Sequence, residues 1–301
     1  MRAHGLQEYG PKSHLQARCP QRAGVSERAP QDREITTLIG MILRDVCGVF
    51  RVCGMASSVR YIGALAKTAP QCLKAHSLGP ADRAMGTGPF RVRRQTMHSL
   101  LGHPQSCAMT LIRQIWGRDE YLGNGFLSVP DHGTVLDLGA NIGVFSLLAL
   151  AANPSSRVIA IEPNASFLAT WEANMRRNDL EPRAAVCQAF LGADTAVQRE
   201  LRKTPECRDA ITLSADMLVA HFHLQRIDLL KCDIEGSEFS LFADGSLLDK
   251  TSQLAIELHK QAGAWDGFHA LLVKHGFVMK VIRDTGDFQI LCAKRADGFR
   301  S

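Results

Sequence analysis

Closely spaced cysteine pairs and long apolar runs are both missing from this 301-residue sequence. Its nine cysteines form no C-x-x-C pair and no cysteine–histidine spacing of the kind that binds zinc, which argues against a disulfide framework and against a zinc module. An odd number of cysteines without such spacing indicates a reducing compartment, so we expect a cytoplasmic protein. The most apolar stretch, residues 35–50, is interrupted by Arg44 and Asp45, and no transmembrane span is predicted.

The second half of the chain also lacks an excess of basic over acidic residues. Residues 134–301 contain 18 Lys and Arg against 21 Asp and Glu, whereas residues 1–133 contain 17 against 9. A mildly acidic half is not typical of a surface that binds along a nucleic acid, so we expect no nucleic-acid partner. The densest basic cluster, at residues 91–94, is expected to be a solvated loop.

The first 94 residues differ in pattern from the rest of the chain. Prolines and polar residues dominate residues 1–34, residues 35–69 have apolar positions at helical spacing, and residues 70–95 resemble a linker with prolines and glycines. We therefore predict a poorly ordered or accessory extension over residues 1–94 and one folded domain over residues 95–301.

From residue 134 onward, strand-like and helix-like stretches alternate, and a terminal hairpin follows. Apolar runs at residues 277–282 and 288–293 flank Asp284-Thr-Gly-Asp287, a turn that is typical of a hairpin. This order predicts a doubly wound α/β fold, with a mostly parallel sheet and one antiparallel strand near the C-terminus.

The most informative stretch is residues 134–145. It predicts a buried strand over residues 134–138, then a glycine turn and a helix. Asp137 stands near the carboxyl end of the strand, which faces the ligand crevice in an open α/β sheet. Gly139 and Gly143 allow the backbone to turn sharply and to approach a ligand closely.

A second strand, residues 158–161, ends in Glu162-Pro163-Asn164. An acid at this point is placed to accept hydrogen bonds from both hydroxyls of a ribose, and Asn164 is expected to cap the next helix. Alternatively, Glu162 is a surface acid that favours the N-terminus of that helix. Together with the first strand and its turn, this segment predicts a nucleoside-binding unit, in which Phe190 after the third strand is expected to frame the adenine.

The glycine spacing distinguishes between nucleoside cofactors. A dinucleotide site needs G-x-G-x-x-G, because the second glycine lets the backbone reach the pyrophosphate, and here Asn141 occupies that position. The Asp137 carboxylate would repel a pyrophosphate, but it suits the cationic amino-acid end of S-adenosylmethionine. The pattern therefore favours S-adenosylmethionine over NAD, with backbone groups of Gly139, Ala140 and Asn141 along the methionine portion. The alternative is a turn without a ligand, in which Gly139 and Gly143 serve packing alone.

Two further predicted strands end in titratable residues. Asp233-Ile-Glu235 follows the fourth strand, and Glu257-Leu-His259 ends the fifth. Alternation puts Glu257 and His259 on one side of their strand, and histidine is a suitable base for a hydroxyl proton near neutral pH. The structural alternatives are a histidine bonded to the backbone and acids that only favour a helix N-terminus. These side chains are also of the types that bind Mg²⁺, but we expect catalysis without a metal.

Four motifs, in this order, resemble the FkbM-type methyltransferases, a branch of the class I S-adenosylmethionine-dependent fold. They are Asp137-Leu-Gly-Ala-Asn-Ile-Gly143, Ile161-Glu-Pro-Asn164, residues 227–238 and Ile256-Glu-Leu-His259. The resemblance implies a seven-stranded Rossmann-like sheet, S-adenosyl-L-methionine as the cofactor, and O-methylation, often of sugar or natural-product hydroxyls.

We therefore expect a methyltransferase domain that acts on a hydroxyl of a small molecule or saccharide. His259, Asp233 and Glu235 are the expected catalytic residues, with His259 or Asp233 as the base. Trp116 and Tyr121 are expected near the acceptor. The alternatives are an amine or protein side-chain acceptor, an NAD-binding enzyme on the same architecture, and a donor-binding protein without activity. The sequence predicts no particular oligomeric state.

Overall fold

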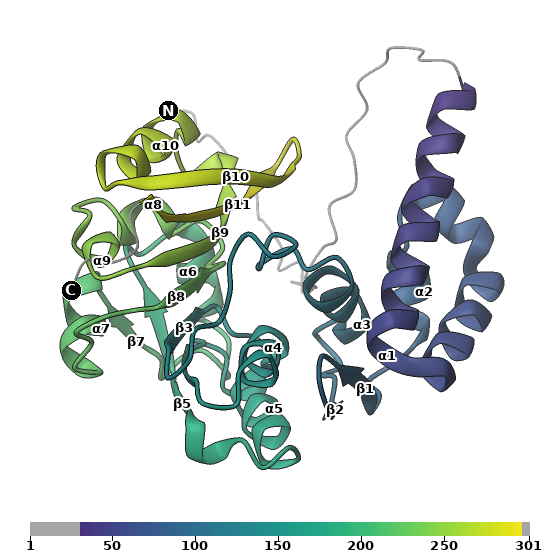
Figure 1. The fold of residues 1–301 in the computed structure, drawn as a ribbon, viewed down its shortest axis with the longest axis horizontal. Helices are drawn as coiled ribbons and strands as arrows, with labels where there is room; N and C mark the ends of the chain where they lie inside the picture. The colour runs from purple at the N-terminus through teal and green to yellow at the C-terminus, as the bar shows by residue number, and fades with distance from the viewer. Residues whose placement is uncertain (1–30, 297–301) are drawn as a thin grey trace, which may run out of the picture.

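The computed structural model describes the backbone of residues 31–296, and the side chains of residue 40 and residues 42–296 (Figure 1). What the sequence predicts for residues 1–30 lies outside the described residues. No helix in the described part of the chain is both long and apolar enough to cross a membrane.

Seven strands form the central sheet, in the order β10-β11-β9-β8-β3-β4-β5. Their bounds are Thr134–Leu138 (β3), Arg157–Ile161 (β4), Ala184–Cys187 (β5), Leu229–Cys232 (β8), Gln253–His259 (β9), Phe277–Asp284 (β10) and Phe288–Arg295 (β11). Neighbouring strands are parallel from β9 to β5, whereas β11 is antiparallel to both β9 and β10. The predicted fold, a mostly parallel seven-stranded sheet with one antiparallel strand near the C-terminus, is confirmed.

Helices and short strands surround this sheet. The helices are α1 (Gln31–Ala75), α2 (Gly79–Ala84), α3 (Ala108–Leu111), the π-helix η1 (Ile112–Gly117), α4 (Val144–Ala152), α5 (Ala165–Arg176), η2 (Glu181–Arg183), α6 (Ala196–Leu201), α7 (Ala215–His221), α8 (Glu238–Leu241), α9 (Ser246–Asp249), η3 (Lys260–Ala262) and α10 (Trp265–Lys274). The short strands are β1 (Phe90–Arg93), β2 (Met97–Leu100), β6 (Ala189–Leu191) and β7 (Ile211–Leu213).

Both faces of the sheet are covered, because its central strands are apolar on both sides. All five residues of β3 are buried. Val135 packs in the same layer as residues of α4 and α5, whereas Leu136 and Leu138 pack in the opposite layer with residues of α7, α8, α9 and α10. Continuous apolar strands of this kind are typical of parallel sheets with helices on both faces.

The helix start that the sequence marks at Asn164 is capped as expected. The side-chain oxygen of Asn164 accepts hydrogen bonds from the N–H groups of Ser166 and Phe167, at 2.9 and 3.2 Å. Ser214 accepts one from the N–H of Met217 at 3.2 Å. Each cap satisfies donors that have no partner within the helix.

The sequence predicts a third strand over residues 183–191, and the structure divides this stretch into two strands. β5 belongs to the main sheet, whereas β6 leaves it and pairs in parallel with β7. Gln188 stands at the break, and its side-chain amide donates to the carbonyl oxygens of Pro163 and Glu206, both at 3.0 Å. These two bonds attach the segment that follows β6 to the end of β4.

The prediction of a linker over residues 70–95 is wrong, because this range contains the end of α1, α2 and β1. Gly54, with φ of 71°, divides α1 into two helical segments that meet at a bend (Figure 1). Phe90 and Val92 of β1 are buried. The range is ordered because its apolar residues join the same core as η1 and α4.

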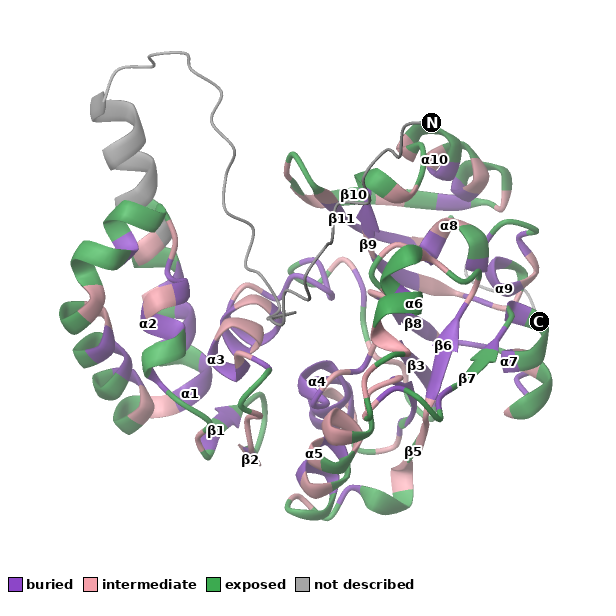
Figure 2. Cartoon of the chain, turned by 180° about the vertical axis from the view of Figure 1, so that it is seen from behind, coloured by how far each residue is buried: buried purple, intermediate pink, exposed green. Residues whose placement is uncertain are grey.

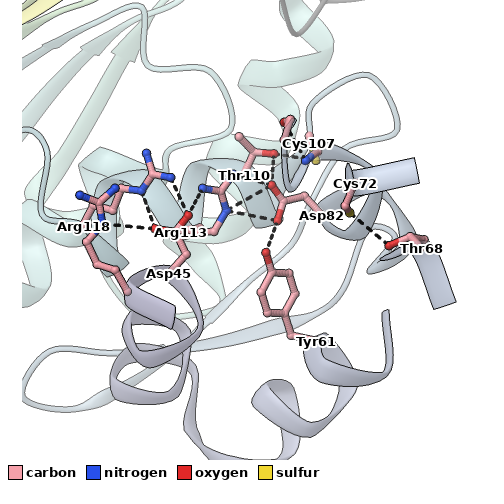
Figure 3. Close-up of polar contacts among 12 residues, drawn as sticks. Asp45, Tyr61, Thr68, Cys72, Asp82, Cys107, Thr110, Arg113 and Arg118 are labelled. Atoms are coloured by element: carbon pink, nitrogen blue, oxygen red, sulfur yellow. Dashed lines mark hydrogen bonds and ion pairs between the residues drawn. The ribbon is translucent and has the colours of Figure 1, made fainter. Parts of the chain in front are cut away.

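A buried polar network joins the N-terminal helices to η1 (Figure 3). Asp45 and Asp82 are fully enclosed, and Arg113 pairs with both, at 2.8 Å to Asp45 Oδ2 and 2.7 Å to Asp82 Oδ2. Arg118 Nη2 lies 2.5 Å from Asp45 Oδ2, and the Tyr61 hydroxyl donates to Asp82 Oδ1 at 2.8 Å. The described part of the first 94 residues is therefore docked on the segment that leads to the sheet, and the domain division at residue 94 stays a prediction.

Candidate active site

The four motifs meet along one edge of the sheet, where β3, β4, β8 and β9 end. The N–H of Asp233, after β8, donates to the carbonyl of Leu138 at 3.1 Å. The N–H groups of Gly139 and Ala140, after β3, both donate to the carbonyl of Ile161, at 2.9 and 3.0 Å. These bonds hold the ends of three strands together at the edge where open α/β sheets bind ligands.

Asp137 is fully buried in β3, and its charge is paired. Its Oδ2 accepts a hydrogen bond from Ser146 Oγ at 2.6 Å, and Lys231 Nζ lies 3.4 Å from its Oδ1. Within the described residues, no hydrogen bond reaches Oδ1. Burial disfavours the charge on Lys231, but Asp137 and Asp233 outweigh burial and raise the pKa of the lysine.

Sequence reasoning missed Lys231. Its ammonium also donates to the carbonyl oxygens of Leu138 and Gly139, at 3.1 and 2.7 Å. The available signal was a lysine inside a strand that is otherwise apolar, since lysine is almost never fully buried without a partner. Lys231 therefore fixes both the carboxylate of Asp137 and the backbone of the glycine turn.

The glycines of this turn approach other parts of the protein. Gly139 has φ of 74°, and a Cβ at this position would lie 1.8 Å from the carbonyl oxygen of Asp233. Gly143 has φ of 86°, and a Cβ there would lie 2.6 Å from Cδ1 of Trp171. Packing thus explains both glycines, and the expected close approach to a ligand at Gly139, Ala140 and Asn141 stays a prediction.

Glu162 is buried at the end of β4, with 7% of its surface exposed, so the interpretation as a surface acid is wrong. Its Oε2 accepts a hydrogen bond from the N–H of Asn141 at 2.9 Å, and its Oε1 accepts one from the N–H of Asn164 at 3.0 Å. Burial raises the pKa of Glu162 to about 7, although these two bonds favour the charged form. Each oxygen retains a lone pair for a further donor, which is what a ribose diol requires.

Phe190 lies in a small separate cluster of buried residues. It packs with Cys207 and Ala210, and the guanidinium carbon of Arg202 lies 4.3 Å from its ring centroid. One face of the ring is thus covered by Arg202. A role of Phe190 beside the adenine stays a prediction.

Three side chains gather at the ends of β8 and β9. The Tyr121 hydroxyl lies 3.3 Å from Asp233 Oδ2 and 3.4 Å from Glu257 Oε2. Burial raises the pKa of Glu257 to about 8, and the charge of Asp233 acts in the same direction. Burial and the same carboxylates also raise the pKa of Tyr121. The hydroxyl therefore stays protonated and donates a hydrogen bond to one of the two acids.

Trp116 does not face this group. It is 2% exposed, and its Nε1 donates to the carbonyl of Val144 at 3.0 Å. The expectation that Trp116 lies near the acceptor is wrong, because the π-helix turns this ring into the core beneath α4. Tyr121, which follows η1, is the aromatic residue of this segment that reaches the site.

His259 is held in one orientation by a buried carboxylate. Its Nδ1 lies 2.9 Å from Glu238 Oε1, and its Nε2 lies 3.5 Å from Glu235 Oε2 and 3.9 Å from Glu257 Oε1. Glu257 and His259 therefore lie on one side of β9, as alternation predicts. Burial disfavours the charged ring, but the bond to Glu238 and the nearby acids outweigh it and raise the pKa of His259 to about 9.

The sequence alone predicts a mainly structural role for Glu238, and its contacts add a second role, which is to position His259. It is fully buried, and its Oε1 also accepts hydrogen bonds from the N–H groups of Ile234 and Gly236, at 3.3 and 3.1 Å. One oxygen thus fixes both the turn after β8 and the ring of His259. The signal in the sequence was weak, because an acid at a helix start has an ordinary electrostatic explanation.

The same edge also has the composition of a metal site. Ligand atoms of Asp233, Glu235 and His259 all lie within 4.8 Å of one another. Carboxylates and an imidazole suit several divalent ions, and a carboxylate on the second ring nitrogen, here Glu238, is usual for metal-bound histidines. Glu235 is largely open to solvent and has φ of 55°. This arrangement is not specific to a metal, and catalysis without one stays a prediction.

The sequence of this chain is similar to a known protein family and to several characterised proteins. Residues 137–287 match the family described as Methyltransferase FkbM domain. The 31-O-demethyl-FK506 methyltransferase FkbM of Streptomyces tacrolimicus is 28% identical over 221 residues, which cover 59% of this chain and 84% of that protein. Methyltransferase 1 of Beauveria bassiana is 24% identical over 189 residues, 51% of this chain and 76% of that protein.

A third relative is much longer than this chain. The AMB antimetabolite synthetase AmbE of Pseudomonas aeruginosa is 27% identical over 228 residues, which cover 58% of this chain but 11% of the synthetase. The chain therefore spans a small part of that relative and most of the other two. All four motifs lie within the residues that match the family.

Proposed function

The chain belongs to the FkbM methyltransferase family, and on that basis we propose that it transfers a methyl group from S-adenosylmethionine to a hydroxyl of a small molecule or saccharide. The observation that carries this proposal is the position of two buried groups along one edge of the sheet. Glu162 ends β4, His259 ends β9, and the ends of β3 and β8 lie between them.

The residues at the ends of β3 and β4 fit the donor. Glu162 is buried and keeps lone pairs for two hydroxyl donors. Asp137 Oδ1 lies 3.4 Å from Lys231 Nζ but receives no hydrogen bond from the described residues, which leaves an acceptor for a water between it and the amino group of the donor. S-adenosylmethionine, when bound, supplies a methyl group on a positively charged sulfur, from which an acceptor oxygen can displace it.

The residues at the ends of β8 and β9 fit an acceptor hydroxyl. Glu238 keeps the proton of His259 on Nδ1 in the neutral ring, so that Nε2 is the nitrogen available as a base. Tyr121 and Asp233 offer a donor and an acceptor that can orient the hydroxyl. Displacement depends chiefly on alignment of the reacting atoms, and His259 then assists by removing the hydroxyl proton.

The oxygen acceptor is also supported by one relative. The protein of Streptomyces tacrolimicus is named for the methylation of 31-O-demethyl-FK506, a compound that lacks a methyl group on an oxygen. A hydroxyl acceptor in this chain agrees with its histidine, since a hydroxyl must lose its proton during transfer whereas a neutral amine attacks before it loses one.

The test is calorimetric titration of the purified chain with S-adenosylhomocysteine. We expect a micromolar Kd, about −8 kcal/mol. Glu162→Gln should weaken binding roughly tenfold to a hundredfold, because hydrogen bonds to a charged group contribute about 1.5–3 kcal/mol. Glu172→Gln, which changes an exposed acid of α5, is the matched control and should bind as the wild type does.

Two results would contradict the proposal. A folded wild-type chain that binds no S-adenosylhomocysteine would exclude the donor, and NAD would be titrated next. Equal binding by wild type and Glu162→Gln would remove Glu162 from the donor site. When binding is established, the acceptor class follows from transfer of labelled methyl groups to saccharides, small-molecule alcohols and amines.

A further inference from the structure

The second segment of α1, after the bend at Gly54, exposes a continuous stripe of apolar side chains. The stripe consists of Met55, Val59, Ile62, Ala66, Ala69 and Leu73, all exposed. Successive members are alternately four and three residues apart, so they lie on one face of the helix. The larger side chains are open to solvent: Met55 is 72% exposed, Val59 59% and Leu73 58%.

The inward face of this segment is already used. Tyr61, Ala64 and Cys72 are buried in the core that contains η1, and the Tyr61 hydroxyl is bonded to Asp82. The apolar stripe is therefore a second, outward surface. Figure 1 shows this segment at the edge of the molecule, away from the central sheet, and Figure 2 shows exposed residues along its length.

A row of basic residues accompanies the stripe. Arg60, Lys67 and Lys74 are exposed, follow one another at intervals of seven residues, and each comes directly after a stripe residue. No Asp or Glu occurs in the sequence between Asp45 and Asp82, and both of these acids are enclosed in the buried network. The outward surface of this segment therefore carries charge of one sign.

We propose that residues 55–74 bind to the surface of an anionic lipid bilayer, with the apolar stripe among the headgroups and the basic row against their phosphates. A helix with an apolar face bordered by Lys and Arg is typical of segments that lie in the membrane interface without crossing it. Anionic lipids attract such cations. Two copies of this chain that paired through the stripe would instead bring rows of like charge together, which favours the lipid over a second copy as the occupant.

The experiment is flotation of the full chain with vesicles of phosphatidylglycerol and phosphatidylcholine, compared with vesicles of phosphatidylcholine alone. We expect binding to the anionic vesicles that falls as salt rises. The triple variant R60E/K67E/K74E should bind roughly a hundredfold more weakly, because each basic residue near an anionic surface contributes severalfold. V59Q/I62Q should bind at least roughly tenfold more weakly, because both changes remove apolar surface that the bilayer would bury.

The matched control is R177E/R208E/K274E, which reverses three exposed charges elsewhere on the chain and should bind nearly as the wild type does. Thermal unfolding of each variant shows whether it is folded. The proposal is overturned by three results: no binding of the folded wild type to anionic vesicles, unchanged binding of R60E/K67E/K74E, or a dimer in sedimentation that V59Q/I62Q dissociates. It does not depend on the methyl donor, so failure of the donor titration would leave it intact.

Discussion

The pair formed by His259 and Glu238 combines catalysis and structure in one contact. Glu238 begins α8, the first helix after β8, and His259 ends β9. Their hydrogen bond of 2.9 Å joins the start of α8 to the end of β9 and sets which ring nitrogen faces Glu235 and Glu257. A carboxylate that serves both purposes cannot be replaced without a change in the proton affinity of the ring.

We predict that Glu238→Gln moves the pH dependence of methyl transfer. Loss of the carboxylate should lower the pKa of His259 from about 9 toward its ordinary value of 6.5, so that the acidic limb of the kcat/KM profile moves to lower pH. Glu172→Gln, which changes an exposed acid of α5, is the control and should leave the pH profile unchanged. An identical pH profile for wild type and Glu238→Gln would show that Glu238 does not position His259.

The same pKa shift has a consequence for stability. Because the pKa of His259 is raised in the folded chain, its charged form stabilises the fold fully below pH 6.5, and this contribution is lost as pH rises through about 9. The free energy of unfolding of the wild type should therefore fall over this range. His259→Gln should show a smaller fall, measured by denaturant unfolding at several pH values.

Among the residues at the ends of the strands, Lys231 is the one whose replacement should lower the free energy of unfolding most. We predict that Lys231→Met destabilises the chain by about 3–5 kcal/mol, because it leaves the buried carboxylate of Asp137 without its cation. The double variant Lys231→Met with Asp137→Asn should recover much of this loss. Denaturant unfolding measures both, and a double variant less stable than Lys231→Met would contradict the pairing.

At the scale of the elements, the glycine turn after β3 shows why one residue type is required. Gly139 needs both a left-handed φ and space for the carbonyl of Asp233. Gly125 has a similar φ of 85°, but a Cβ added there would have no neighbouring atom within 4 Å. The two glycines therefore separate the cost of backbone conformation from the cost of a steric clash.

We predict that Gly125→Ala costs about 1–2 kcal/mol, the usual penalty for a left-handed residue with a Cβ. Gly139→Ala should cost about 1–3 kcal/mol more, because the added carbon collides with backbone rather than with a side chain that can move. Thermal or denaturant unfolding compares the two. Equal losses would show that the turn can shift away from Asp233.

The sequence predicted the regular elements well where periodicity and caps agree. β3 and the cap at Asn164 follow directly from the apolar run and the side-chain acceptor. The break between β5 and β6 was not predictable, because it depends on bonds from Gln188 to two distant carbonyls. The pairing of Asp137 with Lys231 likewise depends on strand order, which places β8 beside β3.

At the scale of the whole molecule, the N-terminal helices and the sheet share one core. Val49, Tyr61 and Phe90 pack in the same cluster as Trp116, Phe145 and Trp171. The charges between the two regions are likewise complementary, since Asp45 and Asp82 neutralise Arg113 and Arg118. The prolines and glycines of residues 70–95 predicted a linker instead of this docking. The docking was missed because a buried ion pair leaves no periodic pattern in the sequence.

We predict that a chain that begins at residue 95 is markedly less stable than the full chain. The deletion removes both acids that pair with Arg113, and it also removes the buried apolar residues Val49, Tyr61 and Phe90, so the part of the shared core that they cover becomes exposed to solvent. Thermal unfolding is the measurement, and a shortened chain as stable as the full one would show that the first 94 residues are dispensable to the fold.

The segment from Arg113 to Tyr121 has one end in the buried network and the other at the acids of the site. Arg118 bridges Asp45 and Glu120, and Tyr121 follows directly with its hydroxyl between Asp233 and Glu257. A substitution at one end of this segment is therefore expected to shift the other end. Among homologues of this chain, we expect substitutions at Asp45, Asp82 and Arg113 to occur together. Homologues that lack the N-terminal helices should have a different aromatic residue in place of Tyr121.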